Sequence, residues 1–273
     1  MDYQQGFEGY LTFRFLRDFQ NKLFYSSYNQ SYNYDYSYKI GSGDTLLKSG
    51  DTFKNVEVGL SMRFGLRENH LNLLNQTISL GTRFPYLWMR IVYSSPSIGS
   101  SFKYTKLDLK IEKSYRIKGI GKLGFMIMAG KTFGDAPATL LHYGRGMRSG
   151  DVGLYIENAF NTMLPNEFLS DQYGSIHLHL NVGALYKSKF SAPELSFVAA
   201  TGWGNLNNPE FHQIIEFKTM EKFYNETGLL LDNIFVYKSA GIGAGVFYRM
   251  GEYAFNDATA NLATRISLFY RLE

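Results

Sequence analysis

The sequence predicts an all-β protein, an antiparallel transmembrane β-barrel with about 11–12 strands. Three observations support this fold class. Apolar and polar residues alternate with a period of two through many segments of the 273-residue chain. Aromatic residues make up 16% of the chain, and they favour both strands and the interfacial girdles of membrane barrels. The mean hydropathy is only −0.21, as expected when one face of each strand meets lipid and the other meets water.

The individual strands follow from the alternation. In Val56–Phe64 the apolar side chains share one face, whereas Glu57 and Arg63 lie on the other. A tilted strand needs about 9–11 residues to cross a bilayer, and most of the alternating segments reach this length. We expect strands at 6–15, 22–34, 53–65, 86–94, 102–115, 121–132, 172–186, 194–204, 223–231, 239–250 and 260–271, with a possible twelfth near 152–160.

The charged faces distinguish a membrane barrel from a soluble β-sandwich or a lipocalin-like barrel. A sandwich has short strands and an apolar inner face. In the predicted strand 102–115, one face carries charges throughout its length: Lys106, Asp108, Lys110 and Glu112. The apolar side chains between them would face lipid. Because an unpaired backbone amide is costly in lipid, strands that cross a membrane must form a closed barrel. We expect these mixed charges to brace the lumen, and an ion-selective pore surface is the alternative.

The predicted connections alternate between short and long, as in outer-membrane barrels. Lys118–Gly121 is a short one, and Tyr36–Thr52 and Gly134–Asp151 are long ones. Arg67–Pro85 breaks the rule, because strict up-and-down counting places this long connection on the periplasmic side.

Other function classes find little support. We find no uncharged apolar run long enough for a transmembrane helix, and no basic cluster that would bind nucleic acid. His177 and His179 share a strand face but make an incomplete metal site. Gly241–Gly245 lies within a strand pattern, outside the context of a dinucleotide loop. A hydrolase embedded in the barrel would need one of four candidate bases, none in a nucleophile motif: His142, His177, His179 and His212. We therefore expect no enzymatic activity and no cofactor or metal.

The chain is expected to be a single barrel domain, 1–273. Met1 is followed by neither a basic start nor an apolar core, so the first residues do not read as a secretory leader. A barrel must still be exported. We therefore expect upstream strands, a periplasmic domain and a signal peptide to be missing from this sequence.

Several segments resemble the C-terminal barrel of a Gram-negative outer-membrane family of unknown function, whose members carry an N-terminal carboxypeptidase-regulatory-like domain. The matches run through most of the chain in family order. They are Ser79–Pro85 (SLGTRFP), Tyr104–Leu107 (YTKL), Ala129–Pro137 (AGKTFGDAP), Phe160–Met163 (FNTM), Glu167–Tyr173 (EFLSDQY), Gly202–Gly204 (GWG), His212–Gln213, Phe217–Lys222 (FKTMEK) and Gly241–Arg249 (GIGAGVFYR).

A more distant similarity is to the bacterial surface-antigen superfamily of sixteen-stranded barrels, which insert outer-membrane proteins or move polypeptides. Their sixth extracellular loop folds into the lumen and carries an Arg-Gly motif. Gly134–Met147 has a similar layout, which makes Arg145 and Gly146 the candidate motif. The superfamily's partner acid lies two residues before a strand glycine, and Ala200 occupies that position here. The open alternatives for a partner of Arg145 are Glu157, Asp108 and Glu112.

If Gly134–Asp151 is the sixth loop, six predicted strands precede it and about five follow. The resemblance then implies the C-terminal part of a sixteen-stranded barrel, and a smaller twelve-stranded barrel is the alternative. It implies an outer-membrane protein that acts in protein assembly, translocation or envelope scaffolding. Passive or substrate-selective pores are the alternative class, and a barrel hydrolase is a third. The expected partners are outer-membrane lipid and either other envelope proteins or a periplasmic domain of the same protein.

Overall fold

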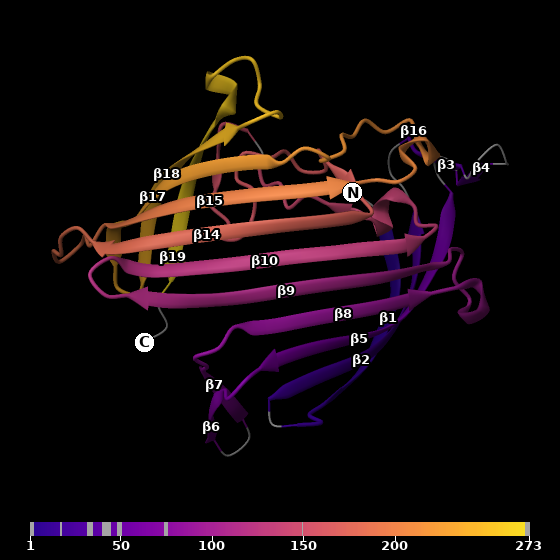
Figure 1. Cartoon of the computed structure of the whole chain (residues 1–273), viewed down its shortest axis with the longest axis horizontal. Coiled ribbons are helices and arrows are strands. Elements are labelled where there is room, and N and C mark those ends of the chain that lie inside the picture. Colours follow the sequence, from indigo (N-terminus) through magenta and orange to yellow (C-terminus); the bar gives the residue numbers. More distant parts are fainter. Residues whose placement is uncertain are drawn as a thin grey trace.

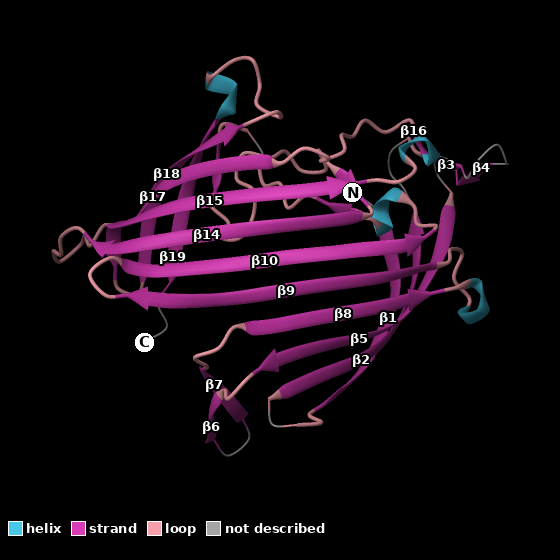
Figure 2. Ribbon diagram, in the orientation of Figure 1, coloured by secondary structure: helices cyan, strands magenta, loops and turns pink. Residues whose placement is uncertain are grey.

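The main feature of the structure, a computed structural model, is one large curved β-sheet (Figures 1 and 2). The structure describes residues 3–16, 18–31, 35–39, 45–47, 51–73, 76–148 and 150–270. Each long strand pairs antiparallel with its neighbour in the sheet, which confirms the predicted all-β class and all eleven predicted strands. In sheet order they are β1 (Tyr3–Phe13), β2 (Phe19–Ser31), β5 (Thr52–Gly65), β8 (Tyr86–Ser94), β9 (Tyr104–Ile117), β10 (Gly121–Gly134), β14 (Gln172–Ala184), β15 (Glu194–Asn205), β17 (Tyr224–Tyr237), β18 (Ala240–Met250) and β19 (Leu262–Tyr270).

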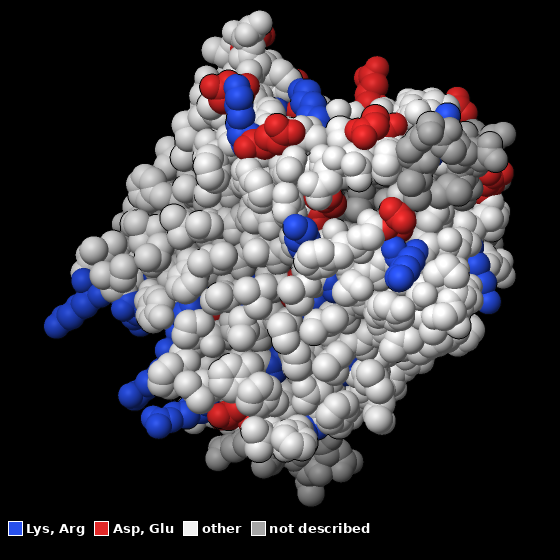
Figure 3. Space-filling view, turned by 45° about the vertical axis from the view of Figure 1, so that its right-hand side comes forward, with Lys and Arg blue, Asp and Glu red and all other residues white. Residues whose placement is uncertain are grey.

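The two faces of the sheet differ as the alternation predicts. On β18, Ile242 and Val246 are each 49% exposed, whereas Phe247 and Arg249 on the opposite face are fully buried. Successive side chains of a strand point to opposite faces, so the apolar row lies outside and the polar row lines the concave side. We call that concave side the lumen. The part of the outer surface seen in Figure 3 accordingly carries few charged side chains between its two ends.

The connections separate into two ends. Short turns lie at one end, at the left of Figure 1, and long connections lie at the other. Arg67–Pro85 lies at the turn end and is long because it folds into a hairpin of β6 (Asn69–Leu73) and β7 (Gln76–Gly81). The buried carboxylate of Glu68 fixes its base by accepting hydrogen bonds from Arg63 at 2.6 and 2.8 Å. Up-and-down counting therefore holds throughout.

The predicted twelfth strand near 152–160 is wrong as a membrane-crossing strand. The segment supplies only β12 (Val152–Leu154), which pairs in parallel with β19. Backbone hydrogen bonds flank the pairing, from Tyr155 to Ile266 and from Thr264 to Asp151, each 2.8 Å long. β1 and β12 are the two ends of the strand order, so the twelve-stranded sheet is open.

A buried aromatic cluster closes part of the loop end. Four connections contribute to it, and short elements within them hold it in place: β3 (Ser37–Lys39), β4 (Thr45–Leu47), η1 (Pro96–Ile98), η2 (Ala138–Leu140), η3 (Pro209–Phe211) and β16 (His212–Gln213). The Tyr36 hydroxyl accepts a hydrogen bond from the backbone N–H of Ala138 at 2.9 Å and forms a second one, 2.8 Å long, with Nδ1 of His212. We call this group the loop-end cluster; its buried members include Tyr36, Tyr38, Phe53, Phe102, Tyr104, Leu140, Leu169 and Leu206. Within the described residues, no helix is long and apolar enough to span a membrane.

Candidate functional site

The connection between β10 and β14 forms the centre of the candidate site. It covers residues 135–171, longer than the predicted Gly134–Asp151, and includes η2, β11 (His142–Tyr143), β12 and β13 (Leu169–Ser170). In Figure 1 it runs behind β14 and β15, on the side that the curved sheet encloses. Its contacts with the inward faces of β17, β18 and β19 place it in the lumen. We call it the lumenal connection.

A buried carboxylate on β17 holds the middle of the lumenal connection. Glu226, 1% exposed, accepts hydrogen bonds from the backbone N–H groups of Asn161 and Thr162, each at 2.8 Å. It also accepts the Thr162 hydroxyl at 2.6 Å. Arg265 of β19, fully buried, donates to the carbonyl of Asn161. The backbone at this point is thus held from two strands, by a carboxyl group and by an arginine.

In the second anchor the carboxylate lies in the lumenal connection and the arginine lies on a strand. Glu167 in the connection forms a two-pronged ion pair with Arg249 of β18, at 2.7 and 3.0 Å. The Arg249 side chain is fully buried and lies 4.8 Å from the Tyr224 ring. Burial acts to raise the pKa of Glu167, but the hydrogen bonds and charge of Arg249 outweigh it and lower that pKa. Glu167 is therefore ionised at neutral pH.

A third contact joins the connection to the next loop. Arg148 donates to the backbone carbonyl of Ala260, within η4 (Thr259–Asn261) between β18 and β19. Its other nitrogen lies 3.5 Å from Asp151. Three separate contacts therefore attach the connection to the last three strands of the sheet or to the loop between them.

The predicted motif lies in this connection but makes different contacts. Arg145 is exposed, and its Nη1 atom lies 3.4 Å from the sulfur of Met128. Among the described ion pairs, none joins Arg145 to a carboxylate, so the expected pairing with an acid is not found. The three carboxylates that were considered have other partners: Glu157 has His179, Asp108 has Tyr173 and Glu112 has Lys110.

Gly146 is buried, and a Cβ atom there would collide with the carbonyl oxygen of Leu164. The glycine therefore permits a close backbone approach inside the connection. Ala200, where the superfamily has its acid, packs in an apolar cluster with Phe160, Met163 and Tyr224. The position of the superfamily's acid is thus surrounded by apolar side chains here. The carboxyl groups that hold the connection are those of Glu226 and Glu167.

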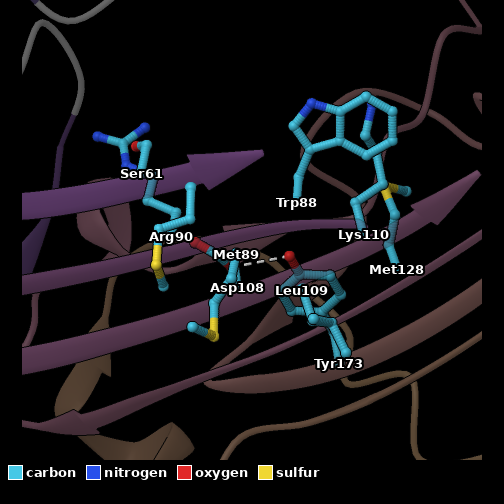
Figure 4. Close-up of a pocket in the computed structure, with 10 residues that line it drawn as sticks. Ser61, Trp88, Met89, Arg90, Asp108, Leu109, Lys110, Met128 and Tyr173 are labelled. Carbon is cyan, nitrogen blue, oxygen red and sulfur yellow. Dashed lines mark hydrogen bonds between the residues drawn. The ribbon is translucent and has the colours of Figure 1, made fainter. Parts of the chain in front are cut away.

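Two of the predicted lumen charges, Asp108 and Lys110, line a hollow of about 300 Å³ (Figure 4). Asp108 accepts the Tyr173 hydroxyl at 2.8 Å, which braces β9 against β14 across β10. Lys110 lies 3.2 Å from Glu112 and 3.7 Å from the Trp88 ring. Lys106 lies over the Tyr104 ring at 5.4 Å. Lys106 contacts Tyr104, and Lys110 contacts Glu112, within the same strand, so the bracing of the lumen by these charges stays a prediction.

The histidines are placed for packing. His142 stacks on Tyr173 with the ring centroids 3.4 Å apart, and burial lowers its pKa to about 3. His177 lies against Phe160, and His179 lies 3.4 Å from Glu157. In the described part of the chain, no group of three potential ligands could hold a metal ion.

Sequence reasoning did not find the two anchors. The period-two alternation of segments 239–250 and 260–271 puts Arg249 and Arg265 on polar strand faces but does not indicate their partners. The two arginines were the sequence feature that could have predicted the anchors, because cations on inward strand faces require buried acceptors. Glu226 and Glu167 carried no comparable pattern.

A curved antiparallel sheet with a long connection seated in its lumen gives the chain a barrel-like, all-β fold. Neither a protein-family model nor a curated protein sequence matches it. Its structure is similar to that of BamA from Haemophilus ducreyi lacking POTRA domains 1–3, with a TM-score of 0.57 and 15% sequence identity. The match covers 98% of this chain and 55% of that chain, so the chain spans about half of its length. This similarity confirms the all-β, barrel-like fold, whose sheet is open within the described residues. The resemblance to the carboxypeptidase-regulatory-like family stays a prediction.

Proposed function

We propose that the protein is an outer-membrane barrel that acts in the assembly or translocation of other envelope proteins, with its lumen closed by the lumenal connection. The observation that carries this proposal is the anchoring of that connection by Glu226 and by the Glu167–Arg249 pair. A loop that only lined an open pore would not need buried ionic contacts with several strands. The similarity to a BamA barrel supports the same class. The proposal includes no enzymatic activity.

Single-channel conductance tests whether the lumen is closed. We expect the purified protein to show no steady current in planar bilayers. Replacing residues 136–168 by a short Gly-Ser linker is expected to give a large stable current, because the strands at its two ends are neighbours. Glu167→Ala is expected to give brief openings, since it removes one anchor and keeps the connection.

The double variant Lys222→Gln/Glu252→Gln is the matched control. It removes an ion pair of 2.8 Å whose side chains are both about two-thirds exposed. We expect this variant to stay closed. A steady current through the unmodified protein that the linker variant does not increase would instead identify a passive pore.

The assembly role needs its own measurement. Vesicles containing the protein are expected to accelerate the insertion of a urea-unfolded outer-membrane barrel, compared with empty vesicles of the same lipid. The gel mobility of unheated samples reports the folded fraction. Equal insertion rates with and without the protein would rule out the assembly role even if the lumen is closed.

A further inference from the structure

We propose that the turn end of the barrel carries a binding surface for the head groups of anionic phospholipids. This inference rests on the proposed outer-membrane location, in which short turns face the periplasm and thus the inner leaflet. It adds a specific lipid class to the membrane partner expected from the sequence.

Every connection at the turn end contributes at least one exposed cation. They come from four turns and from the β6–β7 region, so they are distributed along the whole curved edge. Figure 3 shows several of them projecting at the lower left. We call this set the basic rim: Arg14, Arg67, Arg83, Arg116, Lys118, Lys187, Lys189 and Lys238.

The chain itself does not neutralise the basic rim. The described connections at this end contain two carboxylates, Asp18 and Glu68. Glu68 is buried and bound to Arg63, which is not part of the rim. Asp18 accepts a backbone N–H from Arg67 at 3.2 Å. Among the described ion pairs, none includes a member of the rim, so its charge is available to an external anion.

Exposed aromatic side chains accompany the cations. Lys189 lies 5.1 Å from the Phe190 ring, and Lys238 lies 5.5 Å from the Tyr237 ring. Phe190 and Tyr237 are 46% and 57% exposed. Aromatic residues of this kind mark the interfacial depth of a membrane, where head groups lie. The rim cations are therefore at the level of lipid phosphates.

The opposite end has the reverse character. Its connections expose several carboxylates, among them Glu210, Glu216, Glu221 and Asp257. Exposed Lys222 and Lys218 at that end are paired with Glu252 and Glu167. Figure 3 shows the red side chains gathered toward the top and right. The positive surface is thus specific to the turn end.

The geometry favours a bilayer over an acidic protein. A protein partner would require a compact patch, whereas these cations follow the whole edge of the sheet. A membrane surface meets such an edge along its full length, and each basic residue near an anionic surface adds to the attraction. An acidic partner protein is the outcome that would replace the proposal.

Native mass spectrometry tests the site. The full chain is released from bilayers of phosphatidylethanolamine, prepared with and without phosphatidylglycerol. The rim variant is Lys187→Gln/Lys189→Gln/Lys238→Gln. The control, Lys54→Gln/Lys103→Gln/Lys222→Gln, removes three exposed lysines from the loop end. We expect the unmodified protein and the control to retain phosphatidylglycerol preferentially, and the rim variant to lose that preference by about tenfold or more.

Gel mobility of unheated samples confirms that each variant is folded. Equal retention of phosphatidylglycerol by all three proteins, or an equal loss in both variants, would overturn the proposal. Unchanged lipid retention with loss of binding to an acidic envelope protein would assign the rim to that partner. Lipid retention is measured independently of conductance and insertion rates, so it can fail while the proposed function holds.

Discussion

At the scale of single residues, the lumen contains charges that are fully buried and paired. Arg249 and Glu167 are the clearest case, since their side chains are 0% and 6% exposed. Removing one partner of such a pair is costly because the other charge remains buried without compensation. Removing both is much less costly. The alternation of β18 placed Arg249 inside, but it could not supply Glu167, which lies 82 residues earlier in an irregular segment.

We predict that Arg249→Ala lowers the free energy of unfolding by about 3–5 kcal/mol. The double variant Glu167→Gln/Arg249→Met is expected to recover a large part of this loss, because no buried charge is left unpaired. Urea unfolding monitored by tryptophan fluorescence measures both. A double variant as unstable as Arg249→Ala would show that packing, and not the uncompensated charge, causes the loss.

At the scale of elements, the lumenal connection has a defined fold of its own. The close approach of the backbone at Gly146 and Leu164 brings its two halves together, and β12 attaches it to β19. Strands that cross the membrane could be predicted because a period of two is repeated over many residues. The connection could not, because its path depends on single long-range contacts that leave no periodic signal. This is also why a strand of three residues was mistaken for the start of a longer one.

We predict that Gly146→Ala destabilises the connection by about 1–3 kcal/mol, because the added methyl group must displace the Leu164 backbone. Limited trypsin cleavage at Arg145 and Arg148 is expected to become faster. Gly9→Ala is the control, since a Cβ atom at that position meets open space. Similar cleavage rates in the two variants would argue against the close approach.

At the scale of the whole molecule, four connections meet in the loop-end cluster. His212 lies within it, and burial lowers its pKa to about 4. The folded protein therefore keeps this histidine neutral where the unfolded chain, with a pKa of about 6.5, binds a proton. Its contribution to stability is complete above about pH 6.5 and is lost as the pH falls from there towards about 4.

We predict that His212→Gln is less stable than the unmodified protein at pH 7.5 and that this difference shrinks between pH 6.5 and 4. Thermal unfolding followed across this range gives the difference directly. His142 also titrates at low pH, so only the difference between the two proteins isolates His212. A difference that stays constant with pH would mean that His212 does not change its protonation on unfolding.

The lumenal connection leaves and returns at neighbouring points of the sheet. Lys131 and Gln172 are paired in the ladder, and the N–H of Thr132 donates to the carbonyl of Asp171 at 2.6 Å. Compared with a six-residue turn, an excursion of roughly 37 residues costs only about 1.6 kcal/mol in closure entropy. The strand register therefore does not depend on what lies between these points. The length of the lumenal connection can therefore change without changing the barrel wall, provided that the new segment still pairs the buried Glu226, Arg249 and Arg265.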